Sequence, residues 1–422
     1  MKDHVSQSLN RVHAWIGLFS AWILFAVFAT GTLTVFDEEI TYWMLQPEIQ
    51  KITTASGPVE FQQPEIRTAV LHMESPPEGS DGDGRVQLIK WQDKRTFTGQ
   101  SIDPITGNLL VFRETRGGDL FYHFHYGLLA GLAGVWMVGA AAIAMLAATT
   151  TGVLIRRRRL LADLFTVRFR TVLLRTWSDV HNVAGLLMLP FLLIITVTGL
   201  MVLWSIYLAG GTTVSGETAV SLPGLLHFGR FGGIASRWAY FIMGLGSSLV
   251  IATGLATRTA KRRRGRLDRS EPIASRVTDG LAIGAVAGLP VAVAAFFWVN
   301  RLLPTAVPHR AEWEVRAFFF VWTLCALYGP LRRDAVLAWR DQLTAAAILL
   351  ALLPGLNLLT TRSHLLATVP NDQWGLAAVD ITAFVVGALL TWLAVRVRSG
   401  LIEESGGRLS VLSASDAGSR SS

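Results

Sequence analysis

Two pairs of histidines stand at matching positions in a duplicated sequence. The heptapeptide VHAWIGL returns as VHNVAGL 168 residues later, and the tetrapeptide FHYG returns as LHFG 102 residues later. The first repeat carries His13 and His181, and the second carries His125 and His227. Each segment is followed further along the chain by a Thr-Gly dipeptide. The glycines of these dipeptides, in chain order, are Gly31, Gly152, Gly199 and Gly254.

Two imidazoles that face each other between apolar helices suit a b-type haem. Neutral imidazoles can ligate the haem iron from both sides, and the porphyrin is an apolar disc that fits between membrane helices. The two pairs therefore predict two haem b groups. Zinc is one alternative, but two imidazoles underfill a tetrahedral site and no carboxylate or thiolate accompanies them. Helix packing is the other, because Thr-Gly and Gly-x-x-x-Gly patterns are common packing devices.

The elements that must position these histidines are membrane helices. The chain has 422 residues, of which 51% are hydrophobic and only 16% charged, and this composition excludes a soluble globular protein. Its single cysteine, Cys325, excludes a disulfide framework, a Cys-based zinc or iron–sulfur site and a covalently attached c-type haem. A helix of about 20 residues crosses a bilayer. Eight apolar runs of sufficient length cover residues 13–36, 125–155, 181–207, 227–257, 276–300, 314–331, 341–360 and 375–396.

The basic residues orient this bundle. Most of the 38 lysines and arginines lie in the two termini and in segments 156–180, 258–276 and 332–340, which share one side of an eight-helix count. The positive-inside rule makes that side cytoplasmic. The basic segments therefore need no nucleic acid to explain them.

Both copies of the duplicated hairpin keep the same orientation. His13 and His181 then lie at the cytoplasmic ends of their helices and are called the inner pair. His125 and His227 lie at the opposite ends and are called the outer pair. At 1.5 Å per residue, Gly31 lies about 27 Å from His13 along the helix, near the level of the outer pair. Each Thr-Gly glycine is therefore expected to offer the other macrocycle a notch without a side chain.

Other residues compete for these roles or could support them. His123 is the local competitor of His125, but it has no histidine counterpart in the second copy. Arg11, Arg175 and Arg230 lie near the proposed ligands and could pair with haem propionates, although interfacial snorkelling explains them equally well. Loop residues that could help an anionic ligand to dock outside the membrane, with ordinary loop polarity as the simpler account, are Arg301, Arg310, Arg362, His309 and His364.

One large loop interrupts the first copy of the hairpin. It is more acidic than basic and is expected to fold as a small α+β ectodomain outside the membrane. A helical pattern covers residues 62–73, and alternating patterns predict strands at 85–91, 95–103 and 108–114. We find no catalytic pattern in this loop.

The membrane repeat and the end of this loop resemble the PepSY-associated transmembrane family. The likeness rests on His-x-x-x-Gly-Leu followed by Thr-Gly, and on the segment IDPITGNLL at residues 102–110 ahead of a His-bearing helix. It covers about residues 8–265 in motif. The resemblance implies a di-haem ferric siderophore reductase of the inner membrane with His13, His181, His125 and His227 as haem ligands. This chain lacks the flavin and nicotinamide domains of some members, so its electron donor must be separate.

The expected fold is an all-α integral membrane bundle of about eight transmembrane helices, with a PepSY-like periplasmic domain inserted between the first two. The expected divisions are the N-terminus with the first helix (1–36), the periplasmic domain (37–121), the haem-binding helices (122–265), the later helices (266–398) and a disordered cytoplasmic tail (399–422).

The expected function is reduction of a ferric siderophore or another Fe(III) chelate at the periplasmic face. Electrons come from a separate cytoplasmic or membrane donor. Two alternatives are a permease for a siderophore or peptide, and a membrane-anchored module that restrains a protease. The permease lacks a matched pair of broken helices in inverted halves. The anchor would not need two pairs of histidines separated by membrane face.

Overall fold

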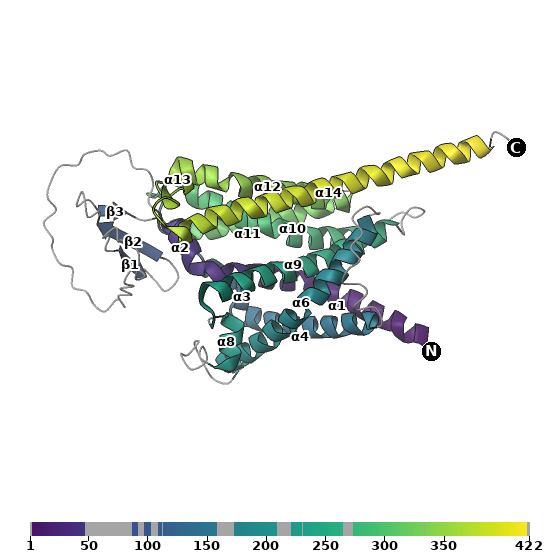
Figure 1. Cartoon of the computed structure of the whole chain (residues 1–422), viewed down its shortest axis with the longest axis horizontal. Coiled ribbons are helices and arrows are strands. Elements are labelled where there is room, and N and C mark those ends of the chain that lie inside the picture. The colour runs from purple at the N-terminus through teal and green to yellow at the C-terminus, as the bar shows by residue number, and fades with distance from the viewer. Residues whose placement is uncertain are drawn as a thin grey trace.

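The computed structural model describes residues 2–46, 87–91, 97–102, 109–111, 113–157, 173–208, 221–229, 231–264, 273–332 and 334–419. Within these residues the chain is a bundle of long helices with a small sheet at one end (Figure 1). The long helices are α1 (Lys2–Leu33), α4 (Gly131–Arg156), α6 (Leu173–Leu203), α9 (Gly233–Arg264), α10 (Ile273–Leu302), α11 (Arg310–Leu331), α12 (Ala335–Thr360) and α14 (Trp374–Ser419).

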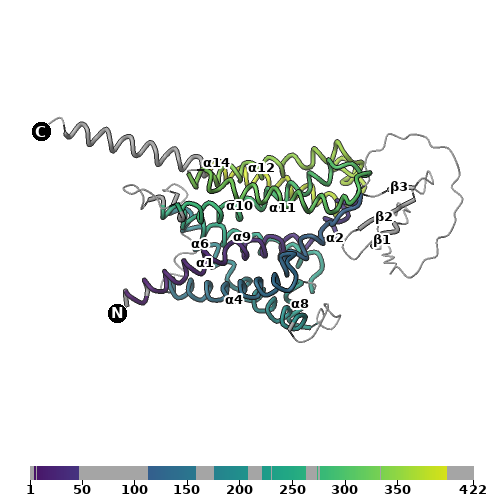
Figure 2. The backbone as a smooth tube through the Cα atoms, turned by 180° about the vertical axis from the view of Figure 1, so that it is seen from behind, coloured from purple at the N-terminus to yellow at the C-terminus, as the bar shows by residue number. Residues whose placement is uncertain are grey.

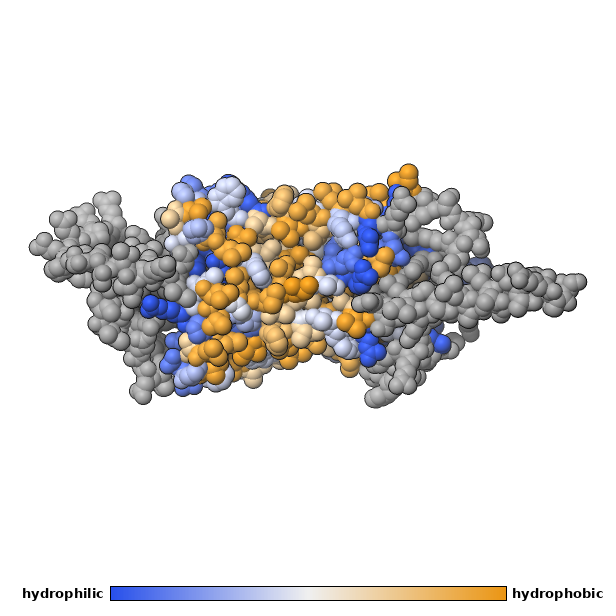
Figure 3. All heavy atoms as spheres, turned by 90° about the horizontal axis from the view of Figure 1, so that it is seen from above, coloured by the Kyte–Doolittle hydropathy of each residue, from blue (hydrophilic) through white to orange (hydrophobic). Residues whose placement is uncertain are grey.

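Seven of these helices are long and apolar enough to cross a membrane, namely all except α11. The prediction of a multi-pass helical membrane protein is therefore confirmed, and the count of eight spans is not. Charged residues in the first two turns of α11 lower its mean hydropathy, although the helix lies against α10. Apolar side chains cover the middle of the visible face and polar ones lie at its two edges (Figure 3).

The long helices form two groups. The first contains α1, α4, α6 and α9, and the second contains α10, α11, α12 and α14 (Figure 2). In the second group, glycines every fourth residue on α10 allow close backbone contact with α11. A Cβ on Gly284 would stand 2.4 Å from the backbone of Ala326, and one on Gly288 would stand 2.4 Å from the Cβ of Cys325. Small residues at such a contact let helices approach closely inside a membrane.

The outer histidines do not start the spanning helices, and the predictions of continuous helices over residues 125–155 and 227–257 are wrong in this respect. His125 lies near the end of a short helix, α3 (Asp119–Gly127), and His227 near the end of another, α8 (Leu222–Phe228). Each short helix ends at a left-handed residue whose N–H donates to the carbonyl four residues earlier, a common C-terminal cap. These residues are Leu128 and Gly229.

The inserted segment contains a three-stranded antiparallel sheet in the order β1 (Gln87–Trp91), β2 (Phe97–Ile102), β3 (Leu109–Val111). These strands fall within the three that the alternating patterns predict. The predicted helix over residues 62–73 lies outside the described residues. A PepSY-like α+β domain therefore remains a prediction. At the other end of the chain, α14 continues to Ser419, where a disordered tail was expected from residue 399. No proline interrupts its hydrogen bonds beyond the bilayer-length segment.

Buried polar side chains fasten both ends of the inserted segment to the second helix group. Before the insertion, the short helix α2 (Asp37–Leu45) presents Trp43, whose ring lies 3.6 Å from the guanidinium of Arg301. The indole N–H of Trp43 donates to Asp380 at 3.1 Å. After the insertion, the Thr115 hydroxyl donates to Glu314 at 2.6 Å. The expectation that Arg301 belongs to a polar outer loop is therefore wrong, because its side chain is 2% exposed.

Helix α11 offers a matched test of this buried network. Arg310 and Glu314 form a fully buried ion pair at 2.6 Å, while Arg316 and Glu312 form an exposed pair with the same four-residue spacing. Glu314→Ala is expected to cost about 3–5 kcal/mol, because it removes the negative charge that balances the buried guanidinium of Arg310. Glu312→Ala is expected to cost less than about 1 kcal/mol. Unfolding of both variants in the same detergent measures the difference, and equal losses would contradict the buried pairing.

Candidate functional site

The structure brings the four repeat histidines together as two separate pairs. The ring centroids of His125 and His227 are 6.0 Å apart, with 29° between the ring planes. The ring centroids of His13 and His181 are 6.2 Å apart, with 64° between the planes. The short helices α3 and α8, which carry the outer pair, lie toward the end of the bundle that carries the sheet (Figure 1). The inner pair lies in the first halves of α1 and α6.

The separation within each pair matches two ligands on one metal atom. A metal–imidazole bond is about 2 Å long and the ring centroid lies about 1 Å behind its nitrogen, so two ligands on opposite sides place their centroids about 6 Å apart. Parallel rings in direct contact would sit closer, near van der Waals distance. Each pair is thus spaced to hold one atom between its two rings.

Each imidazole is oriented by a hydrogen bond from Nδ1 to a backbone carbonyl of a neighbouring helix. His125 Nδ1 lies 2.8 Å from Val27 O, and His181 Nδ1 lies 2.9 Å from Val250 O. The corresponding distances are 3.0 Å from His13 Nδ1 to Ala148 O and 3.2 Å from His227 Nδ1 to Ile195 O. A carbonyl can only accept, so Nδ1 carries the proton and Nε2 keeps its lone pair. Among the described residues, no Nε2 of these four histidines makes a hydrogen bond.

The Thr-Gly dipeptides create these positions for the imidazoles. Every acceptor carbonyl belongs to the residue four positions before the glycine, so the ring lies across the glycine. A Cβ on Gly31 would stand 2.6 Å from His125 Cε1, and one on Gly199 would stand 2.7 Å from His227 Cε1. The equivalent distances to His181 and His13 are 3.0 Å at Gly254 and 3.4 Å at Gly152. The glycines thus receive the histidine rings, where the sequence predicted only a notch for the macrocycle.

The threonine of each dipeptide turns its hydroxyl back to its own helix. Thr30 donates to Ala26 O and Thr198 to Ile194 O, both at 2.7 Å. Thr151 and Thr253 make the same bond four residues back in their helices. Thr151 Oγ1 also lies 3.1 Å from His13 Nδ1. These bonds satisfy the hydroxyls inside an apolar bundle.

His123 is held away from the ligand position by both of its ring nitrogens. Nδ1 lies 2.7 Å from the Tyr126 hydroxyl and Nε2 lies 3.1 Å from an Asp119 oxygen. Burial raises the pKa of the Asp119 carboxyl to about 6, against the opposing effect of Arg116. His125, and not His123, is the histidine beside His227.

The structure describes two of the three arginines that were predicted to pair with haem propionates. Arg11 and Arg175 are exposed, which leaves their guanidinium groups accessible at the inner end, and Arg230 lies outside the described residues. Within the described part of the chain, no group of three His, Cys, Asp or Glu side chains gathers as a metal site. A tetrahedral ion between either pair would therefore lack two ligands of these types there.

These observations test the fit of a haem to the chain. Each pair offers two neighbouring imidazoles with the proton on Nδ1 and the lone pair on Nε2, in apolar surroundings, and a porphyrin would supply the four remaining ligands of its iron. The backbone acceptors of Nδ1 are the functional groups that the sequence analysis missed. Their regular position, four residues before each repeated glycine, is the signal that could have found them.

Comparison with known proteins gives one finding. The family model for the PepSY-associated TM region matches residues 10–223, about half of the chain. The matched range contains His13, His125 and His181 and ends shortly before His227. No curated protein and no solved structure matches the chain.

Proposed function

Because the chain belongs to the family of PepSY-associated transmembrane proteins, we propose that it is a di-haem electron-transfer protein of the bacterial inner membrane. It reduces a periplasmic ferric siderophore or another Fe(III) chelate and releases Fe(II) for iron acquisition. Its electrons come from a separate cytoplasmic or membrane donor. One observation carries this proposal. Within each histidine pair the ring centroids are about 6 Å apart, and the Nε2 atoms have no hydrogen-bond partner among the described residues.

The residues of the chain have distinct roles in this proposal. His13 and His181 hold one haem, and His125 and His227 hold the other. Val27, Ala148, Ile195 and Val250 accept the Nδ1 protons, which fixes the ring orientation and makes each imidazole a better donor to iron. A bound haem supplies a one-electron couple between ferric and ferrous iron.

Iron reduction explains how the metal would leave its chelate. Siderophores present hard oxygen ligands that prefer Fe(III), so Fe(II) is held less tightly and dissociates. No general acid or base is needed for this exchange. The sheet-bearing end of the bundle, next to the outer pair, is the proposed face for the chelate.

The distribution of charge supports the orientation. Arg156 ends α4, Arg262 lies in the last turn of α9 and Arg340 lies near the start of α12. Both termini lie at the end of the bundle opposite the sheet (Figure 1). Basic flanks of this kind stay in the cytoplasm. The sheet-bearing end then faces the periplasm.

Reconstituted vesicles test the proposal directly. Vesicles containing the protein, with dithionite inside and a ferric hydroxamate with an Fe(II)-specific chromogenic chelator outside, are expected to form external Fe(II). Protein-free vesicles and the His125→Ala variant should stay at background, since the outer ligand is missing. Entry of the ferric hydroxamate into the vesicles without formation of Fe(II) outside them would instead support a permease.

A further inference from the structure

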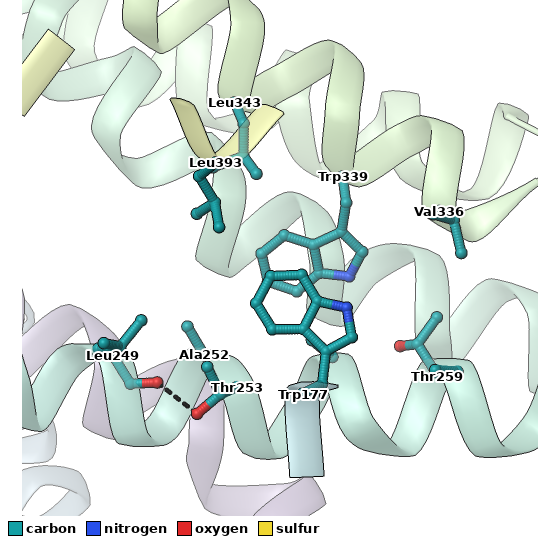
Figure 4. Close-up of a pocket in the computed structure, with 11 residues that line it drawn as sticks. Trp177, Leu249, Ala252, Thr253, Thr259, Val336, Trp339, Leu343 and Leu393 are labelled. Atoms are coloured by element: carbon teal, nitrogen blue, oxygen red, sulfur yellow. Dashed lines mark hydrogen bonds between the residues drawn. The ribbon is translucent and has the colours of Figure 1, made fainter. Parts of the chain in front are cut away.

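An apolar cavity lies between the two helix groups near the end that carries the termini. It is partly open to its surroundings and leaves about 50 Å³ to the centre of a water-sized sphere. Figure 4 shows the indoles of Trp177, from α6, and Trp339, from α12, extending into it from opposite sides. Thr253 and Ala256 of α9 and Leu393 of α14 also line the cavity. No charged side chain is among the residues that line this cavity.

Trp339 brings an unused hydrogen-bond donor to this cavity. Its side chain is 9% exposed, and its Nε1 atom has no hydrogen-bond partner among the described residues. Other indoles of the same helix group are paired, as Trp298 donates to Leu349 O at 2.8 Å and Trp322 to Ala285 O at 2.9 Å. An indole N–H can only donate. A ligand of the cavity therefore needs a hydrogen-bond acceptor.

The cavity and the inner pair lie on two sides of α9. Thr253 lines the cavity, while the next residue, Gly254, lies against the His181 ring. His181 also bonds to the Val250 carbonyl of the same turn. Consecutive helical residues are about 100° apart around the axis, so the cavity lies close to the inner pair.

We propose that this cavity binds the head group of a lipid-soluble quinone. Such a head group is planar, uncharged and apolar, and its ring carbonyl would accept the Trp339 N–H. A phospholipid head group carries a phosphate, for which the lining offers no cation. The proposal rests on the proposed function and names its electron donor as a quinol. Oxidation of one quinol to quinone releases two electrons and two protons, and the electrons reduce two Fe(III) chelates to two Fe(II).

Binding to the purified full-length protein in detergent tests the site. Titration with decylubiquinone by calorimetry is expected to show one site per chain. Trp339→Phe keeps the ring and removes the donor, so the dissociation constant should rise about tenfold, the loss expected for one buried hydrogen bond. Ala256→Leu should weaken binding further by filling the cavity. Trp136→Phe is the matched control, because Trp136 is 57% exposed on α4 and does not line the cavity.

A photoreactive azidoquinone gives an independent location of the ligand. Its adducts should map to the peptides of α9 and α12 and should decrease in Trp339→Phe. Equal affinity in all variants, or adducts confined to other helices, would overturn the site. The same titration with a variant in which all four histidines of the inner and outer pairs are replaced by alanine separates the two proposals. Quinone binding that persists in a protein found to hold no haem would keep the site and remove the electron-donor role.

Discussion

Alanine in place of His125 is expected to halve the haem content of the purified protein. The wild type should hold about two b-type haems per chain and the variant about one, because each iron needs both of its imidazoles for stable low-spin ligation. His227→Ala should remove the same haem, and His13→Ala the other. A pyridine haemochrome assay counts the haem, and the dithionite-reduced minus oxidised spectrum reports whether the remaining one is low-spin.

His123→Ala is the matched control for this experiment. His123 lies on the same short helix, two residues from His125, but both of its nitrogens bond to Tyr126 and Asp119. The control is expected to keep both haems. Loss of haem from His123→Ala with retention in His125→Ala would reverse the ligand assignment. A wild type without haem, after expression with an adequate haem supply, would show that the paired imidazoles serve packing.

The second large effect is expected from one methyl group on Gly31. The added Cβ of Gly31→Ala would stand 2.6 Å from the His125 ring, well inside the contact distance of about 3.5–4.0 Å between carbon atoms. The ring must leave its position across the glycine and lose its bond to Val27 O. We expect the outer haem to be lost or to become high-spin, which the same spectra measure.

The control for Gly31→Ala is Gly152→Ala, on α4 of the same copy of the hairpin. A Cβ on Gly152 would stand 3.4 Å from the His13 ring, a distance that a small shift of the ring can relieve. Gly152→Ala should therefore keep both haems. Size-exclusion profiles and thermal unfolding in detergent show whether the Gly31 variant remains folded. If both variants keep two low-spin haems, the glycines do not position the imidazoles.

The helices and the grouping of the histidines could be predicted from the sequence because both leave periodic signals. Apolar runs of bilayer length mark the helices, and the two repeat offsets align each histidine with its counterpart. In the structure each of these histidines lies beside its counterpart, His13 beside His181 and His125 beside His227. The acceptors Val27, Ala148, Ile195 and Val250 obey the same offsets, but they are backbone carbonyls, which the identity of the residue does not reveal.

Other features could not be predicted because their sequence signals have two meanings. Gly127 and Gly131 have the spacing of a helix-packing motif, yet they flank the turn that separates α3 from α4. The sequence places Arg310 in a polar outer loop, yet its side chain and that of its ion-pair partner Glu314 are fully buried. In each case distant contacts decide between the meanings. Glu314, for example, also accepts from Asn300 on α10.

The repeat has a consequence for the ancestry of the site. Every Nδ1 bond and glycine contact forms within one copy of the hairpin, since His125 packs against α1 of its own copy and His13 packs against α4 of that copy. Each 6 Å gap, in contrast, joins equivalent residues of the two copies. Equivalent residues that meet lie on a twofold axis, as in a symmetric dimer. A single ancestral hairpin could orient both of its imidazoles, but it needed a second copy of itself to complete either pair.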